Sequence, residues 1–528
     1  MNRKEFILFT TIVVIGVFLR FFGIGSQSVW IDEYITADFA NENNILKTFI
    51  SSYANDPHPP LYYMLVHIFM KLFGTSEMSL RFVSFLFGVI NIFIVYKLCR
   101  SFFSQEISFI TLIFFTFSSY NIYYSQEARM YTMFLTFSLL IVYYFIISVK
   151  YNYFTEKSFV AFSILGLYTH TYTILLLVIL NLLYFIKYRE DIRQELWIKA
   201  NLAIAIFAIP LIPFYVKTLL TAHVSHRMNM FIAPFLTFKS FMCGLTIGLN
   251  VFTILTVLIF LLLIVIAVIS NRRYKEKKVI EILLYISLLF VLIPWVESLF
   301  GKPVYSDRTL IPVSVFFIII LSVGVSYLFR SAKIFVVVLY LLINLVSLYN
   351  YYFVDKYRKI DYKKFYETIS ENYKKNEVII HTHVTSYASF EYYNKIKYKT
   401  GFQDRYISEI PEYKGGFLKM QMREAWRKFN NFLNKNLKTE IYAGYDKNIL
   451  TNDELTKTIS NYDKIYFIID DKKGFKQIEL PQSHLWYSNS LPYKERSIDD
   501  FERIKNNFNI EKTHEIYGSK LFILVKKK

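Results

Sequence analysis

The run "VFTILTVLIFLLLIVIAVIS" occupies residues 251–270 and decides the fold class. It carries no charged residue, and about 20 consecutive apolar residues are enough for a helix to cross the hydrocarbon core of a bilayer. Similar runs recur along the chain, which is 54% hydrophobic with a mean hydropathy of +0.33. Since no soluble fold needs many such runs, the sequence predicts a polytopic α-helical membrane protein.

Eleven apolar segments are expected to lie in the membrane. The fifth is too short to span comfortably, and it could form a re-entrant hairpin with the sixth around "YTHTYT" (168–173). Removing both would leave the sidedness of the other segments unchanged. The expected segments are Phe6–Phe22, Leu80–Leu98, Ile107–Tyr123, Met130–Val149, Phe159–Tyr168, Tyr172–Ile186, Ala200–Tyr215, Val251–Ser270, Val279–Leu299, Thr309–Tyr327 and Ile334–Tyr351.

The charge pattern gives the expected orientation. The net charge of +19 is compatible with nucleic-acid binding, but the basic residues form short clusters between apolar runs, as the positive-inside rule requires. The loops on one side are rich in Lys and Arg, so that side, with the N-terminus "MNRKE" as a retained signal anchor, is expected to be cytoplasmic in a plasma (inner) membrane protein. The opposite side receives residues 23–79, 124–129, 216–250 and 301–308, and everything after about residue 352. Cys99 and Cys243 fall on opposite sides, so no disulfide is expected.

The chain changes character after about residue 354. Apolar runs shorten, residues 361–376 have helical spacing, and three buried strands are expected at 377–384, 464–470 and 520–525. The expected organisation is therefore a transmembrane domain at 1–354, which includes the outer loop 23–79 with surface helices, and a small extracytoplasmic α/β domain at 355–528.

Four polar stretches on the outer side carry candidate chemistry. Each also has a structural interpretation, such as a solvated loop, a helix cap or a local ion pair. His67 and His170 are expected to be structural, as are His381 and His383, which share one face of a strand. Asp56 is expected to cap a helix with Pro59 and Pro60 in its first turn. The candidates are Asp32 and Glu33, His58, Glu127 and Arg129, and Lys302, Tyr305, Asp307 and Arg308, with His226 and Arg227 as weaker additions.

Taken together and in order, these stretches resemble a known family. "SQSVWIDE", "HPPLYYMLVHIFMKLFGTSEMSLRFVSFLFGV", "YYSQEARMYT" and "DRTLIPV" are similar to the GT-C glycosyltransferases related to protein O-mannosyltransferases and the lipid A aminoarabinose transferase. "DYKKFYETISENYKKNEVIIHTHVTSYASFEYYN" resembles the start of the outer domain in bacterial members. The resemblance implies a polyprenyl-phosphate sugar donor, catalysis at the outer face, and Asp32 as the catalytic residue.

The residue chemistry agrees with that implication. A carboxylate can take the acceptor's proton, so Asp32 is the expected base, with Glu33 orienting it or sharing its role. Arginine binds phosphate oxygens bidentately, which suits Arg129 and Arg308, with His58, Lys302, Tyr305 and Arg227 behind them. Glu127 is expected to contact the sugar, or to complete a divalent-cation site with Asp32 and Glu33; no cofactor is certain. One base without a second nucleophile favours inversion at the anomeric carbon.

Two alternatives remain. A transporter or flippase of lipid-linked sugars would place its charged residues near the midplane of the membrane, whereas these candidates lie in outer loops. A purely structural membrane scaffold leaves the four motifs unexplained. Neither the sugar nor the acceptor, which could be a lipid, a glycan or a protein of the cell envelope, can be read from the sequence.

Overall fold

The computed structural model divides the chain into two compact units, each treated separately below. The helical unit comprises Met1–Phe22, Pro57–Tyr62 and Arg81–Asn350, and the α/β unit comprises Gly23–Asp56, Tyr63–Leu80 and Tyr351–Lys528. The structure describes residues 2–221, 230–270, 277–300, 304–374, 376–381, 384–407, 449–450, 461–470, 504–505, 507–516 and 519–527.

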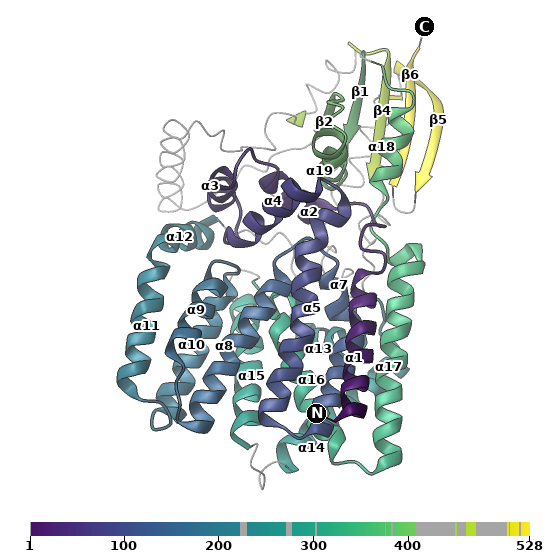
Figure 1. The fold of residues 1–528 in the computed structure, drawn as a ribbon. Helices are drawn as coiled ribbons and strands as arrows, with labels where there is room; N and C mark the ends of the chain where they lie inside the picture. Colours follow the sequence, from purple (N-terminus) through teal and green to yellow (C-terminus); the bar gives the residue numbers. More distant parts are fainter. Residues whose placement is uncertain are drawn as a thin grey trace. The chain divides into compact units, whose positions relative to one another are not determined.

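Long apolar helices make up the helical unit (Figure 1). Each of the eleven segments expected in the membrane coincides with a helix or a bent pair of helices. The helices are α1 (Arg3–Phe21), α5 (Glu77–Phe102, from Arg81 onward), α6 (Gln105–Phe117), α7 (Ser119–Ser125), α8 (Tyr131–Tyr151), α9 (Glu156–Leu167), α10 (Tyr172–Leu183), η1 (Tyr184–Tyr188), α11 (Gln194–Ala208), η2 (Ile209–Leu211), α12 (Ile212–Thr221), α13 (Ala233–Cys243), α14 (Val251–Ser270), α15 (Lys277–Phe300), η4 (Asp307–Leu310), α16 (Ile311–Ser326) and α17 (Arg330–Phe353).

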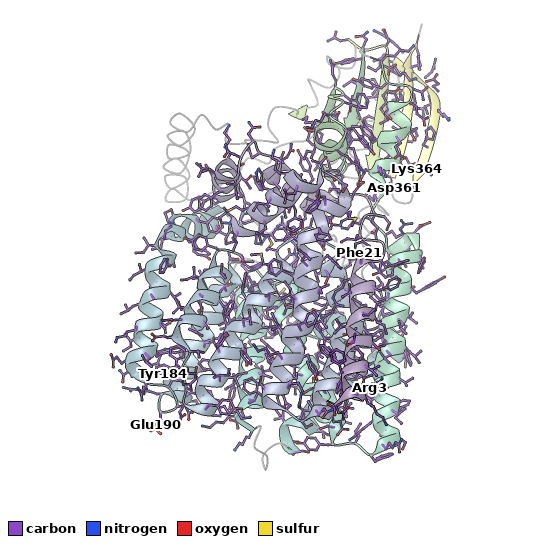
Figure 2. All side chains as sticks on the ribbon, in the orientation of Figure 1. Arg3, Phe21, Tyr184, Glu190, Asp361 and Lys364 are labelled. Carbon is purple, nitrogen blue, oxygen red and sulfur yellow. The ribbon has the colours of Figure 1, made fainter. Side chains whose placement is uncertain are left out.

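Not all of these helices could cross a membrane alone. Among the described residues, 7 are long and apolar enough, and the bent pair α6–α7 makes up to 8. The expected count of eleven is larger because it included α1, which carries Arg3, Lys4, Glu5 and Arg20, and the 12-residue helices α9 and α10. The chain is nevertheless a multi-pass membrane protein. Figure 2 marks the two ends of α1 at Arg3 and Phe21.

The sequence "FSSYN" (117–121) breaks what was expected to be one continuous span. The axis bends by 55° between α6 and α7, and Ser118 ends the first helix and begins the second. The buried guanidinium of Arg20 donates hydrogen bonds to the carbonyls of Phe115 and Thr116, at 3.3 and 3.2 Å. These carbonyls lie at the end of α6, where regular helical partners are missing. Arg20 of α1 therefore stabilises the break.

Close packing fixes the central helix α16, whose residues are almost all buried. A Cβ on Gly324 would lie 2.1 Å from the carbonyl oxygen of Leu263 in α14. Only glycine allows this backbone approach, so replacing Gly324 with alanine would push α14 and α16 apart.

A six-stranded sheet with the order β3-β2-β1-β4-β6-β5 forms the centre of the α/β unit (Figure 1). Strand β1 pairs in parallel with β2 and β4, whereas β6 pairs antiparallel with β4 and β5. The expected strands at 464–470 and 520–525 are confirmed as β4 and β6. The strand expected at 377–384 is confirmed as β1 but ends at His381, because Val384 begins the next helix. The core of the sheet includes Val378, Phe467 and Leu524. The strands are β1 (Glu377–His381), β2 (Asp404–Ile407), β3 (Ile449–Leu450), β4 (Lys464–Asp470), β5 (Phe508–Ile516) and β6 (Ser519–Lys526).

Helices from two parts of the chain, the C-terminal region and the first loop, complete this unit. The expected helix at 361–376 is confirmed as α18 (Tyr362–Ser370), although it is shorter, and the Asp361 carboxylate accepts from the Lys364 N–H at its start (Figure 2). Along the chain, strand β1 comes next, and then helix α19 (Val384–Glu391) and the π-helical η6 (Tyr392–Lys397). The first loop contributes α2 (Ile31–Ala40), α3 (Ile45–Asn55) and most of α4 (Leu61–Phe73).

The first loop was expected to belong with the transmembrane domain, but it is grouped with the C-terminal region. The reason is packing, because α19 and η6 contact α2. Asp56 does not begin a helix, contrary to expectation. It follows the last residue of α3 and accepts a 2.8 Å hydrogen bond from the Tyr63 hydroxyl, while α4 begins at Leu61, after both prolines.

Candidate functional site

The structure brings together two groups of residues, one in each unit, and all of their members except His170 are candidates from the sequence. We call His58, Arg129, His170 and Arg308 of the helical unit the cationic cluster. We call Asp32 and Glu33 of the α/β unit the acid pair. Each is built from its own surroundings.

The loop between α7 and α8 positions Arg129. The Gln126 amide donates to three carbonyls at the end of α1, including those of Arg20 and Phe22 at 2.9 and 2.8 Å. The Arg129 carbonyl accepts from the Ser84 hydroxyl at 2.9 Å, and the Arg129 N–H donates to the Glu127 carbonyl at 2.7 Å. Both ends of the short "QEARM" segment are thus held, which leaves the buried Arg129 side chain in a defined place.

Arg308 is fixed by the turn η4 that leads into α16. The Asp307 carboxylate accepts from the Arg308 N–H at 2.9 Å, and the Asp307 carbonyl accepts from the Tyr120 hydroxyl at 2.8 Å. The Arg308 guanidinium carbon lies 5.9 Å from the centre of the Tyr131 ring, a cation–π contact at the start of α8. Tyr305, another predicted substrate residue, instead donates its hydroxyl to Thr237 at 2.9 Å.

The two histidines face each other beside these arginines. The rings of His58 and His170 are 5.1 Å apart, and His170 stacks on Phe134 at 4.4 Å. His170 Nδ1 accepts from the Tyr172 N–H at 3.1 Å, so in a neutral ring the proton must be on Nε2. Within the described part of the chain, this buried Nε2–H has no hydrogen-bond partner. His170 therefore presents a donor that a ligand could use.

Burial keeps both imidazoles neutral. It lowers the pKa of His58 well below the usual value, and the charges of Arg129, His170 and Arg308 add to the effect. The pKa of His170 falls to about 3, again first through burial and then through Arg129 and Arg308. The positive charge of the cluster thus comes from its two arginines. Arginine together with a neutral N–H donor suits a phosphate.

The acid pair lies in the first turn of α2, where helix N–H groups favour negative charge. Its two members differ in environment. Glu33 is fully buried, and its Oε2 lies 2.9 Å from the ammonium of Lys359. Asp32 is half-buried. The sequence could not separate these two carboxylates, but the structure assigns Glu33 to an ion pair.

The predicted cation site does not fit this arrangement. Glu33, one of its three proposed ligands, already pairs with Lys359. No group of three His, Cys, Asp or Glu side chains in the described ranges could hold a metal ion.

Several other predicted residues belong to neither the cationic cluster nor the acid pair. Glu127 is buried in the "QEARM" segment of the helical unit. Cys99 and Cys243 are both buried thiols. His381 packs against the rings of Tyr387 and Phe390, and burial lowers its pKa to about 3. Lys302, His226, Arg227 and His383 lie outside the described residues.

Three residues near these clusters were not anticipated: His170, Lys239 and Lys359. Lys239 is the single charge in the apolar helix α13, is fully buried, and donates to the Gly244 carbonyl at 3.2 Å. A charge in such a helix is itself a signal of function that could have been used. Neither His170 nor Lys359 carried a comparable signal, because both lie in polar segments.

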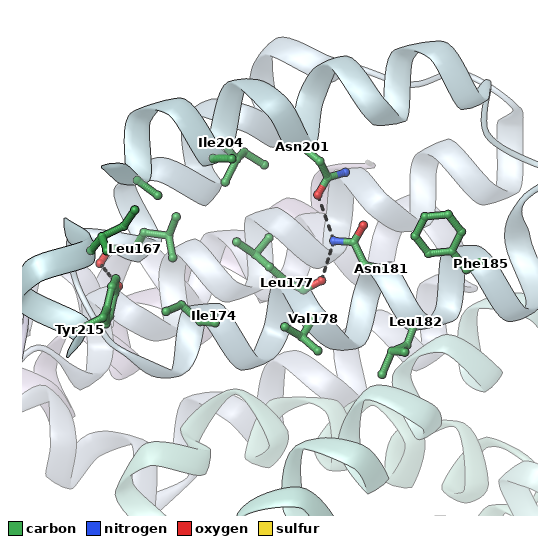
Figure 3. A pocket seen from close by; sticks show the side chains of 13 residues that line it. Leu167, Ile174, Leu177, Val178, Asn181, Leu182, Phe185, Asn201, Ile204 and Tyr215 are labelled. Carbon is green, nitrogen blue, oxygen red and sulfur yellow. Dashed lines mark hydrogen bonds between the residues drawn. The ribbon is translucent and has the colours of Figure 1, made fainter. Parts of the chain in front are cut away.

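An apolar groove of about 580 Å³ lies between α10 and the α11–α12 segment (Figure 3). Its polar contacts include Asn181 donating to Asn201 at 3.0 Å and Tyr215 donating to the Leu167 carbonyl at 2.9 Å. The lining holds no carboxylate, histidine or cation, so it offers no acid–base chemistry. Its lining residues are Leu167, Ile174, Leu177, Val178, Asn181, Leu182, Phe185, Asn201, Ile204, Ala205, Ala208, Ile212 and Tyr215.

Comparison with known proteins gives two matches at the level of sequence. Residues 57–217 match the family model of dolichyl-phosphate-mannose-protein mannosyltransferases. An uncharacterized protein of Aquifex aeolicus (strain VF5) is 31% identical over 165 residues, which is 29% of this chain and only 30% of that relative's length.

The fold resembles that of ArnT from Cupriavidus metallidurans. The apo structure gives a TM-score of 0.60 at 9% identity and covers 97% of both chains. The structure bound to undecaprenyl phosphate gives 0.58 at 10% identity, covering 99% of this chain and 98% of that one. The GT-C fold class expected from the four motifs is thereby confirmed: this chain has the ArnT fold over almost its entire length, and its residues 57–217 resemble the mannosyltransferase family.

Proposed function

We propose that this protein is a polyprenyl-phosphate-sugar-dependent glycosyltransferase. It moves a sugar to an acceptor hydroxyl on a cell-envelope lipid, glycan or protein at the outer face of the membrane. The observation that carries the proposal is the cationic cluster, in which buried Arg129 and half-buried Arg308 lie beside two neutral histidines. The ArnT structure bound to undecaprenyl phosphate supports the choice of a polyprenyl phosphate as the anion.

The donor's phosphate is the group that the cationic cluster would hold. As the bond between the anomeric carbon and the phosphate oxygen breaks, its electron pair passes to the departing polyprenyl phosphate. Arg129 and Arg308 stabilise the charge that develops there, because a guanidinium can donate to two phosphate oxygens at once. His170 supplies a neutral N–H to a third oxygen. No protonation of the leaving group is needed, since a phosphate is already stable as an anion.

The acceptor is the group on which Asp32 would act. Its carboxylate takes the proton from the acceptor hydroxyl, whose oxygen then forms the new bond to the anomeric carbon. Glu33 is held in an ion pair with Lys359, so we assign it a supporting role. One base and one displacement give inversion, which proton NMR of the product anomer would check; a retained anomer would contradict the single displacement.

The distribution of basic residues along the sequence supports the proposed orientation. Lys and Arg cluster in the loops on the same side of the membrane as the N-terminus, and we place that side in the cytoplasm of a plasma (inner) membrane protein. The α/β unit then lies outside, where a lipid-linked donor and an envelope acceptor would meet the enzyme.

Replacing Asp32 with asparagine tests the reaction. We expect transfer to fall by about 10²–10⁴-fold, the usual contribution of a positioned base, while membrane insertion and donor binding stay normal. The assay follows radiolabelled sugar from polyprenyl-phosphate donors into acceptor in reconstituted membranes. Asp355→Asn is the matched control, because the Asp355 side chain is 80% exposed. An Asp32→Asn protein that transfers sugar at the wild-type rate would refute the base assignment.

A further inference from the structure

We propose that Lys359 is a positioning residue for the acid pair: it holds and neutralises Glu33, so that Asp32 alone serves as the base. The inference rests on the proposed function and deepens it. It assigns a catalytic contribution to the segment that follows the last membrane helix, far along the chain from the first loop.

The ion pair itself is unusual in its burial. Lys359 Nζ lies 2.9 Å from Glu33 Oε2, and the two side chains are only 6% and 0% exposed. The ammonium also lies 5.8 Å from the centre of the Trp30 ring, the residue that precedes α2. A buried charge that loses its partner is strongly unfavourable, so each member of the pair determines where the other lies.

The backbone around the pair is held by the same segment. Residues 27–29, which lead into α2, are hydrogen-bonded to residues between 351 and 393 at every position, so the start of α2 is defined by this segment. The bonds are Lys359 N–H to Gln27 Oε1 at 3.1 Å, Gln27 Nε2 to the Tyr351 carbonyl at 3.4 Å, Ser28 Oγ to Asp361 Oδ1 at 2.7 Å, Lys363 N–H to Ser28 Oγ at 3.1 Å, and Val29 N–H to the Tyr393 hydroxyl at 3.1 Å.

This arrangement solves an electrostatic problem. Two adjacent carboxylates repel each other, which would hinder Asp32 from staying ionised beside Glu33. Lys359 supplies the compensating charge at Glu33. The charged groups that α19 and η6 place near α2, Glu391 and Lys395, act on Asp38 near the other end of the helix. Lys359 is thus the cation that the 2.9 Å contact pairs with Glu33.

Three variants test the proposal in the transfer assay. Lys359→Met removes the ammonium but keeps an apolar stem against Trp30. We expect kcat to fall about 10- to 100-fold, with the donor KM within about twofold of wild type. The acid limb of the pH–rate profile should move up by about one pH unit, because Glu33 then repels a charge on Asp32. Lys359→Arg should keep most of kcat. The double variant Glu33→Gln/Lys359→Met should restore the acid limb and most of kcat, because neither charge remains.

The outcomes separate the inference from the function on which it rests. Lys359→Met with wild-type kcat and an unmoved acid limb overturns the role of Lys359, even if Asp32→Asn abolishes transfer. Full transfer by Asp32→Asn overturns the base assignment and this inference together. If Lys359→Met fails to fold by thermal unfolding, the double variant decides the matter. A double variant that folds but stays below about a tenth of wild-type kcat overturns the proposal, and recovery supports it.

Discussion

The cationic cluster and the acid pair treat buried charge in opposite ways. In the cluster, the protein surroundings and two neighbouring arginines lower the pKa values of His58 and His170, so both imidazoles are neutral. In the acid pair, Glu33 is buried just as deeply, but it has the Lys359 ammonium at 2.9 Å. Burial alone discharges a group, whereas burial with a counter-ion lets it keep its charge. The comparison shows that the same depth of burial has opposite consequences with and without a close counter-ion.

This difference has a chemical consequence. The cluster places its arginines beside neutral donors, an arrangement that suits an anionic ligand. In the acid pair, Glu33 is paired with Lys359, and we propose Asp32 as the reactive member. The first region suits binding of the donor phosphate, and the second suits removal of a proton from the acceptor.

Removing an arginine from the cationic cluster should have the largest effect. We expect Arg308→Gln to weaken binding of undecaprenyl phosphate by about 2–3 kcal/mol, roughly 30- to 150-fold in Kd, because a charged hydrogen-bond partner of the phosphate is lost. Arg129→Gln should behave similarly. The control is Arg100→Gln, since Arg100 is exposed in α5. Unchanged Kd in both cluster variants would show that the anion binds elsewhere.

Changing His170 should test whether its neutral Nε2–H contacts the ligand. His170→Asn keeps an acceptor for the Tyr172 N–H but lacks the donor at the Nε2 position, so undecaprenyl phosphate should bind about fivefold more weakly, as expected for one neutral hydrogen bond. His170→Gln can return a donor near that position and should bind almost as wild type does. Equal affinities for the two variants would mean that the Nε2–H does not contact the ligand.

The smallest effect concerns Asp38, a half-buried carboxyl near the end of α2. Burial, followed by the charges of Glu391 and Glu42, raises the pKa of Asp38 to about 7 against the opposing effect of Lys395. A carboxyl whose pKa is raised by folding binds its proton more tightly in the native state. The folded protein therefore loses stability as pH rises from the ordinary pKa of an aspartate, 3.8, to about 7, because the unfolded chain releases this proton first.

Asp38→Asn should remove this dependence. The asparagine stays neutral at every pH, so the Tm of the variant relative to wild type should rise between pH 5 and pH 7 and level off above that. Thermal unfolding of the full chain in detergent at each pH would measure it. A constant difference in Tm across this range would contradict the raised pKa.

The sequence was sufficient for most of the fold. Uncharged runs such as 251–270 fixed the membrane helices, because hydrocarbon leaves few alternatives to a helix. Short apolar runs between polar segments located β1, β4 and β6. The bend at Ser118 was missed because its surroundings are as apolar as a straight span. Helix α13 was missed because its 11 residues, interrupted by Lys239, are too short to register as a membrane segment.

The candidate residues were predicted less completely. Residue type and motif were enough to select Asp32, Arg129, Arg308 and His58. They could not separate Asp32 from Glu33, because that difference depends on Lys359, a contact between distant parts of the chain. They also left His170 as structural, since only its neighbours reveal a buried donor with a defined tautomer.

Product stoichiometry would show whether the protein cleaves the sugar–phosphate bond of a lipid-linked donor. The purified protein is reconstituted with a panel of polyprenyl-phosphate sugars, each labelled in the sugar, and with envelope membranes from a strain that lacks this protein. For the correct donor, we predict one polyprenyl phosphate released for each sugar joined to the acceptor. Movement of the intact lipid-linked sugar across the bilayer, with no polyprenyl phosphate released from any donor, would contradict the account and indicate a flippase.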